Sequence, residues 1–308
     1  MPNNSVQNID ISFLSVVRKA FSQVSSFLIE SNLIIALGAT LLALESLVLV
    51  NAASVSTLSL LVVFFSSMCI YHLAEINFSF QIEPTFKLVL NNNEQSAFHQ
   101  TMFIVSALFL LVSVFFLELS SVLFLMLLTI ITFAYGIVKF KGVSFSFRAL
   151  PIFKNIMLAG MWAMVTVVFP LLVEKTDLFT MAGVLVFVER FLFILVLSFM
   201  FDLRDYYTDP KEGIRTIAGI LGFKKLKYVS QILLLLLAII SVFHFVWFYS
   251  GNNWIPLLLA IVLSLVITSF FIFITNKNKP KQHYSLLFDG ATVIQAVLVL
   301  MLSLLAIN

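Results

Sequence analysis

The chain has 308 residues, of which 61% are hydrophobic and only 11% are charged. Soluble domains carry about 25% charged residues, so the composition excludes a water-soluble fold and predicts a polytopic protein embedded in the lipid bilayer. The net charge of +3 gives no basis for binding nucleic acid, and Cys69 alone cannot form an intramolecular disulfide or a cysteine-based metal centre.

The predicted elements begin with residues 11–30, where apolar side chains recur at intervals of three and four beside Arg18 and Lys19. This pattern predicts an amphipathic helix on the membrane surface, within an N-terminal cytoplasmic segment of residues 1–32. A membrane-spanning helix needs about 20 mainly apolar residues. Nine such stretches follow and predict an all-α transmembrane bundle forming one domain over 1–308: 33–51, 57–78, 101–119, 121–138, 152–173, 179–201, 228–248, 254–275 and 286–306.

Basic residues divide the loops into two classes. Sixteen of the 18 lysines and arginines lie in the N-terminal segment or in the connections that follow the even-numbered spans. The positive-inside rule therefore predicts that the N-terminus and all the long loops are cytoplasmic, in an integral protein of the cell inner or plasma membrane. With nine spans, the C-terminus is expected outside.

Three of the six aspartates, Asp202, Asp205 and Asp209, lie within eight residues at the end of the sixth span. Their i, i+3, i+7 spacing places them on one helix face at the membrane edge. Carboxylates are costly near hydrocarbon, and Mg²⁺ is a suitable partner because it binds carboxylate and phosphate oxygens together. Basic side chains that could balance a polyphosphate are nearby: Arg204, Lys211 and Arg215. The alternative is a solvated loop without a function.

The stretch Asp202-Leu-Arg-Asp-Tyr-Tyr-Thr-Asp209, with Gly213-Ile-Arg-Thr216 and Leu221-Gly222 after it, resembles the second aspartate-rich motif of the UbiA superfamily of intramembrane prenyltransferases. That motif has the form D-x-x-D-x-x-x-D-x-x-x-G-x-x-T and lies between the sixth and seventh spans, as here. The predicted nine-span layout is similar to that of the family over nearly the whole chain. The resemblance also implies that Lys154, which opens the fifth span, faces the cavity.

The first motif of the family, N-D-x-x-D-x-x-x-D, belongs at the cytoplasmic end of the second span. In this chain Tyr71, His72, Glu75 and Ser79 occupy its asparagine and its three aspartate positions, so only Glu75 retains a carboxylate. His72, Glu75 and Ser79 still share one helix face. We therefore expect His72 and Glu75 to contribute to a weaker metal site opposite the aspartate cluster.

The resemblance implies a transferase of prenyl groups. Mg²⁺ on Asp202, Asp205 and Asp209 would bind a polyprenyl diphosphate, and the prenyl group would pass to an unknown acceptor. The diphosphate would be held by four basic residues: Lys154, Arg204, Lys211 and Arg215. The alternative is a non-catalytic UbiA-like protein that binds an isoprenoid lipid or a partner protein, which the altered first motif favours. A solute transporter is disfavoured because the polar residues gather at one membrane edge.

Three charged residues lie within predicted spans and leave alternatives open. Glu189 and Arg190 are either a deep acceptor or proton site, or they form ion pairs with buried groups such as Glu45. Asp289 either reaches the cytoplasmic rim of the cavity or is a carboxylate favoured by a helix N-terminus.

Overall fold

The structure is a computed structural model that describes residues 23–76, 94–136, 151–207, 216–249 and 253–306. Within these ranges the regular secondary structure is entirely helical. The helices, in chain order, are Gln23–Glu30, α2 (Leu33–Leu49), α3 (Thr57–Glu75), α4 (Glu94–Ser113), η1 (Val114–Phe116), α5 (Leu119–Gly136), α6 (Pro151–Ala163), η3 (Met164–Val168), α7 (Phe169–Val173), α8 (Met181–Arg204), α9 (Ile217–Leu221), α10 (Phe223–Trp247), α11 (Ile255–Ile274) and α12 (Lys281–Ala306).

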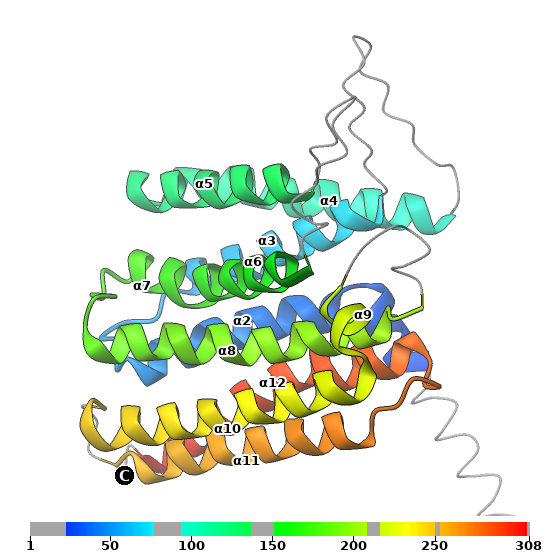
Figure 1. The fold of residues 1–308 in the computed structure, drawn as a ribbon. Helices are drawn as coiled ribbons and strands as arrows, with labels where there is room; N and C mark the ends of the chain where they lie inside the picture. Colours follow the sequence, from blue (N-terminus) through cyan, green and yellow to red (C-terminus); the bar gives the residue numbers. More distant parts are fainter. Residues whose placement is uncertain (1–22, 77–93, 137–150, 208–215, 250–252, 307–308) are drawn as a thin grey trace, which may run out of the picture.

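The long helices lie side by side as a bundle, with α8 between α6 and α10 and with α4 and α5 at one edge (Figure 1). Among the described residues, seven helices are long and apolar enough to cross a membrane, and the bent pair of Gln23–Glu30 and α2 could add an eighth. In α5, the apolar helix among the described residues covers Leu119–Thr132. The all-α membrane bundle is confirmed, whereas the expected count of nine spans is not.

Helix boundaries follow local sequence. Asn32 adopts a left-handed conformation with φ 54°, which asparagine tolerates, and the chain bends there by 70° between the first described helix and α2. The side chains of Ser56, Thr180 and Thr216 accept backbone N–H groups at the starts of α3, α8 and α9. Gly222, with φ 77°, separates α9 from α10.

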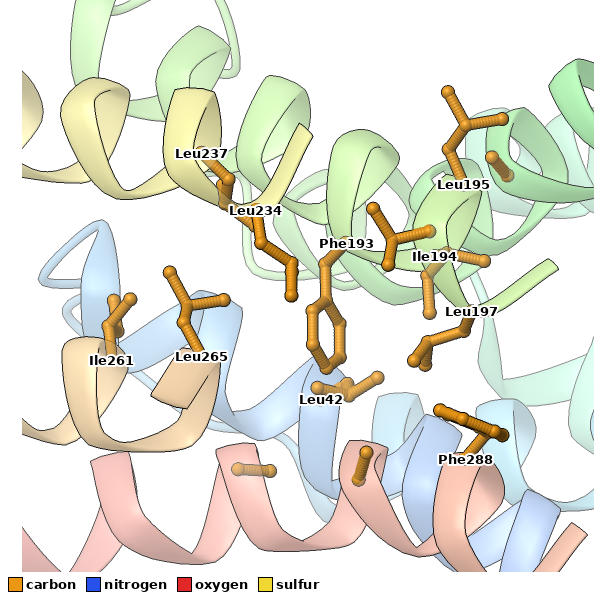
Figure 2. Packing of buried hydrophobic residues seen from close by; sticks show 14 of the residues in the cluster. Leu42, Phe193, Ile194, Leu195, Leu197, Leu234, Leu237, Ile261, Leu265 and Phe288 are labelled. Carbon is orange, nitrogen blue, oxygen red and sulfur yellow. The ribbon is translucent and has the colours of Figure 1, made fainter. Parts of the chain in front are cut away.

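The core lies between α2, α8, α10, α11 and α12. Phe193 of α8 is fully buried and lies near Leu42 of α2, with Phe288 of α12 on the same side (Figure 2). Between helices in a membrane, such contacts stabilise through close packing, since lipid tails are as apolar as leucine. Gly38 of α2 is packed so closely on α12 that a Cβ atom there would overlap the hydroxyl of Thr292. The seam between α2 and α12 is therefore tight.

The opposite edge of the bundle is open to lipid. Apolar side chains on α4 and α5 are highly exposed, including Leu111 at 62% and Ile130 at 63%. Helix α4 packs on α3, and α5 packs mainly on the short α7. The outer face of α4 and most of α5 therefore face the bilayer.

Candidate functional site: a charged rim at one end of the bundle

The first predicted ligand, Asp202, lies in the last turn of α8 and is fully buried. The Nζ atom of Lys154, from the first turn of α6, lies 2.9 Å from its Oδ1 atom. Helices α6 and α8 pack side by side, which places this lysine opposite the aspartate. Burying a carboxylate without a cation costs free energy, and the ammonium group of Lys154 supplies the positive charge that offsets this cost for Asp202.

The second aspartate, Asp205, follows the last residue of α8 and binds two cations. Its Oδ2 atom accepts from Nη2 and Nε of Arg204 at 2.8 and 3.2 Å, and its Oδ1 atom lies 2.9 Å from Nζ of Lys281. Burial alone would raise the pKa of this carboxyl, but the hydrogen bonds and charges of Arg204 and Lys281 hold the pKa below its ordinary value of 3.8. Asp205 is therefore ionised at neutral pH.

Helix α12 contributes a polar stripe to the same rim. Lys281, Ser285 and Asp289 are spaced by four residues and so lie on one face of α12. Ser285 accepts a long hydrogen bond of 3.4 Å from Nη1 of Arg204. Asp289 lies deeper and interacts electrostatically with Arg204 and with Tyr71 of α3. The alternative that Asp289 reaches the rim of the site is therefore favoured.

Three of the first-motif positions, Tyr71, His72 and Glu75, lie on α3, and the side chains of His72 and Glu75 lie in different surroundings. Glu75 is exposed, whereas His72 is buried, with its Nδ1 atom 2.9 Å from Nδ1 of His99 on α4. At that distance one ring donates a proton and the other accepts it. Tyr71 accepts a hydrogen bond of 3.2 Å from Nε1 of Trp162, which ties α3 to α6.

Several predicted residues cannot be placed. Asp209, Lys211, Arg215 and Ser79 lie outside the described residues. Among the residues that are described, no three histidine, cysteine, aspartate or glutamate side chains form a group that could hold a metal ion. The assignment of His72 and Glu75 as metal ligands therefore stays a prediction, as does that of Asp209.

Sequence reasoning missed Lys281, Ser285 and His99. A signal for the first two was present, since Lys281 and Ser285 precede Asp289 by eight and four residues at the start of a predicted span. His99 offered no such signal. Its partner His72 lies 27 residues earlier, and both helices are apolar on most sides.

A second polar cluster lies deep in the bundle. Nη2 of Arg190 on α8 is 3.1 Å from Oε2 of Glu45 on α2 and donates to the carbonyl of Leu42 and to Oγ of Ser46. Gln295 of α12 donates to Oε1 of Glu45 at 3.1 Å, and Glu189 pairs with Nδ1 of His244 on α10 at 3.2 Å. The predicted ion pair between Arg190 and Glu45 is confirmed.

Comparison with solved structures identifies the arrangement. A UbiA homologue from Archaeoglobus fulgidus bound to GPP and Mg²⁺ superimposes with a TM-score of 0.59 over 92% of this chain and 99% of that one. The apo structure of a UbiA homologue from Aeropyrum pernix K1 gives 0.58 over 87% and 97%.

The chain has the UbiA fold. Sequence identity to these two homologues is only 13% and 14%, so the likeness is one of fold. No protein-family model and no curated protein matches the sequence. In the UbiA fold of this chain, the charged rim is formed by the end of α8 and the starts of α6 and α12.

Proposed function

We propose that this protein binds a polyprenyl diphosphate through Mg²⁺ at the charged rim and transfers the prenyl group to an acceptor. The observation that carries the proposal is the rim itself. Asp202 and Asp205 stand with Lys154, Arg204 and Lys281 at one end of an apolar bundle with the UbiA fold. Such a site suits a ligand with a highly charged head and an apolar tail.

The donor set fits the metal. Mg²⁺ prefers carboxylate and phosphate oxygens, and Asp202 and Asp205 lie one helical turn apart at the rim. Asp209 is the third ligand that the sequence motif predicts. Bound Mg²⁺ would neutralise charge on the diphosphate as it leaves. The imidazole of His72 suits a transition metal better than Mg²⁺, so Glu75 is the more suitable of the two first-motif groups.

In the proposed reaction, the bond between the allylic carbon and the diphosphate oxygen breaks, and its electron pair stays on that oxygen. An electron pair of the acceptor forms the new bond to carbon, and the acceptor loses a proton. Lys154 and Arg204 would stabilise the negative charge on the leaving diphosphate. Tyr71, Trp162 and Phe201 supply aromatic faces near the rim helices, where they can stabilise positive charge on the allylic carbon.

The test uses purified protein in lipid nanodiscs with Mg²⁺ and labelled geranyl, farnesyl and geranylgeranyl diphosphates, together with a lipid extract as the source of acceptor. We expect diphosphate release from at least one substrate. Asp202→Asn should reduce the rate at least a hundredfold, because removing one such electrostatic contact costs about 10²–10³ in rate. The matched control is Asp177→Asn on the other side of the membrane, where the amide oxygen can still accept from the backbone N–H of Phe179.

A non-catalytic isoprenoid-binding protein is the second candidate, because Glu75 is exposed and His72 is engaged by His99. The same experiment separates the two functions. Prenyl diphosphate binding that depends on Asp202, without diphosphate release under any condition, would favour the binding protein. Absence of both binding and release would contradict the two proposals together.

A further inference from the structure

Lys281 is positioned to bind another anion in place of the carboxylate of Asp205. It opens α12, and its Nζ atom lies 2.9 Å from Oδ1 of Asp205 while 60% of its side chain stays exposed. A lysine that is so exposed is not held by packing, and an ion pair of this kind contributes little to stability. The ion pair between Lys281 and Asp205 itself can therefore be exchanged for a contact with a stronger anion at small cost.

Basic side chains gather at the rim. The described ion pairs bring three cations, Lys154, Arg204 and Lys281, to two carboxylates, Asp202 and Asp205, and a third carboxylate, that of Asp289, interacts with Arg204. A prenyl diphosphate carries about three negative charges near neutral pH, because the last pKa of a terminal phosphate is near 6. A single divalent cation leaves part of this charge for basic side chains to balance.

The facing side of the site offers little to a second divalent cation. On α3, Glu75 is exposed and His72 is buried against His99, so these two side chains point to different surroundings. The carboxylates that a second magnesium ion would need are therefore missing from the described part of α3, whereas two lysines stand on α6 and α12 at the rim.

We propose that Lys281, together with Lys154, takes the place of a second metal ion, so that the prenyl diphosphate binds with a single Mg²⁺. When Mg²⁺ occupies the oxygens of Asp202 and Asp205, the two ammonium groups turn to the phosphate oxygens. Arg204 stays at the rim, held by Ser285 and by the ring of Phe201 at 4.9 Å. This inference rests on the proposed function and specifies how its site recognises the diphosphate.

The first measurement counts metal ions. Mn²⁺, used as a paramagnetic probe for Mg²⁺, is titrated into nanodisc-embedded protein with saturating geranyl diphosphate, and bound Mn²⁺ is determined from the electron paramagnetic resonance signal. We expect one bound Mn²⁺ per protein that depends on geranyl diphosphate. Two such ions would overturn the inference.

The second measurement is the Kd of geranyl diphosphate at saturating Mg²⁺. Lys281→Met should raise the Kd about tenfold or more, as expected for the loss of a charged hydrogen bond, and Lys281→Arg should restore most of the affinity. Lys279→Met, at an exposed lysine two residues away, is the matched control and should change the Kd less than twofold.

The outcomes separate the two levels of the proposal. Equal affinities of Lys281→Met and Lys279→Met, with wild-type binding intact, would overturn the role of Lys281 and leave the proposed function standing. Wild-type protein that binds no geranyl diphosphate with Mg²⁺ or Mn²⁺ would overturn the inference together with Mg²⁺-dependent binding of this substrate. A thermal unfolding curve for each variant shows whether a loss of affinity reflects unfolding.

Discussion

Asp205 shows how a single residue at the rim depends on its partners. The carboxyl lies just beyond the last turn of α8, where Arg204 and Lys281 keep it ionised despite its burial. The charged form is favoured in the folded protein because the two cations outweigh the cost of desolvation. Stability and pH are therefore linked at this residue.

Because the pKa of Asp205 is lower in the folded protein than its ordinary value of 3.8, its ion pairs stabilise the fold above that pH. Their contribution is lost as the pH falls through the lowered pKa. We expect the difference in Tm between wild type and Asp205→Asn to be constant from pH 7 to about pH 5 and to shrink toward zero below 3.8.

The measurement is thermal unfolding in nanodiscs over this pH range, with wild type and variant run in parallel. Other carboxyls titrate in both proteins, so only the difference between the two curves reports on Asp205. A difference that does not change down to pH 3 would contradict the assignment.

Part of the rim was predictable from the sequence, but the pairing of its residues was not. The spacing of the motif singled out Asp202, Asp205 and Arg204, and the family resemblance added Lys154, whereas Lys281 was missed. The pairing of Asp202 with Lys154 depends on the packing of α6 against α8, which no local pattern encodes. The contact between His72 and His99 depends likewise on how α3 and α4 are rotated, and helices that are apolar all round give little guidance on this.

At the scale of elements, α2, α8 and α12 are joined by charge in the interior of the bundle. Arg190 is 2% exposed and Glu45 is fully buried. Arg190 lies about 18 Å along α8 from Asp202, at 1.5 Å per residue. Among the described residues, Nε and Nη1 of Arg190 find no hydrogen-bond acceptor. The pair therefore holds these helices in register at an electrostatic cost.

Removing only the charge of Arg190 should destabilise the protein more than removing the charges of both Arg190 and Glu45. We expect Arg190→Met to destabilise the protein by about 3–5 kcal/mol, because the carboxylate of Glu45 would stay buried without its cation. The double variant Glu45→Gln, Arg190→Met should recover much of that loss, since no buried charge remains in the pair. The check is reversible unfolding of both variants and the wild type in mixed micelles.

The stability of the double variant also tests whether Arg190 acts through its charge or through other contacts. Equal destabilisation of the single and double variants would show that Arg190 acts through packing or through Ser46 and Leu42, which it also contacts. That result would remove the ion pair as the link between α2 and α8.

At the scale of the whole molecule, the fold was predictable because composition and loop charge both point to a helical membrane bundle. Predicted spans and observed helices agree closely, for example 254–275 with α11 (Ile255–Ile274). The number of spans was harder to predict. Helix α2 has only 17 residues and follows a bend of 70° at Asn32, and the described apolar part of α5 covers Leu119–Thr132.

Orientation in the membrane is a further prediction at this scale. The distribution of lysine and arginine predicts that the rim is cytoplasmic and that the turn after α7 lies outside. In a Cys69→Ser background, Lys175→Cys should react with a membrane-impermeant maleimide in intact spheroplasts. Lys225→Cys, at the start of α10, should react only after permeabilisation. Both native side chains are exposed, so access through the protein does not limit labelling.

The opposite labelling pattern would place the rim on the outer side and would contradict cytoplasmic delivery of the diphosphate. Replacing Lys175 breaks its ion pair with Glu118, but both side chains are mostly exposed, so the loss to stability is small.

The sparse packing of α4 and α5 has a practical meaning for work with this protein. On these two helices, bilayer lipids serve as the neighbours that other helices provide elsewhere in the bundle. Detergents that replace those lipids remove lateral support from α5 and from the outer face of α4, while the seam between α2 and α12 keeps its own contacts. Lipid composition is therefore a variable of the folded state at that edge, and we expect α5 to differ most in stability between micelles and nanodiscs.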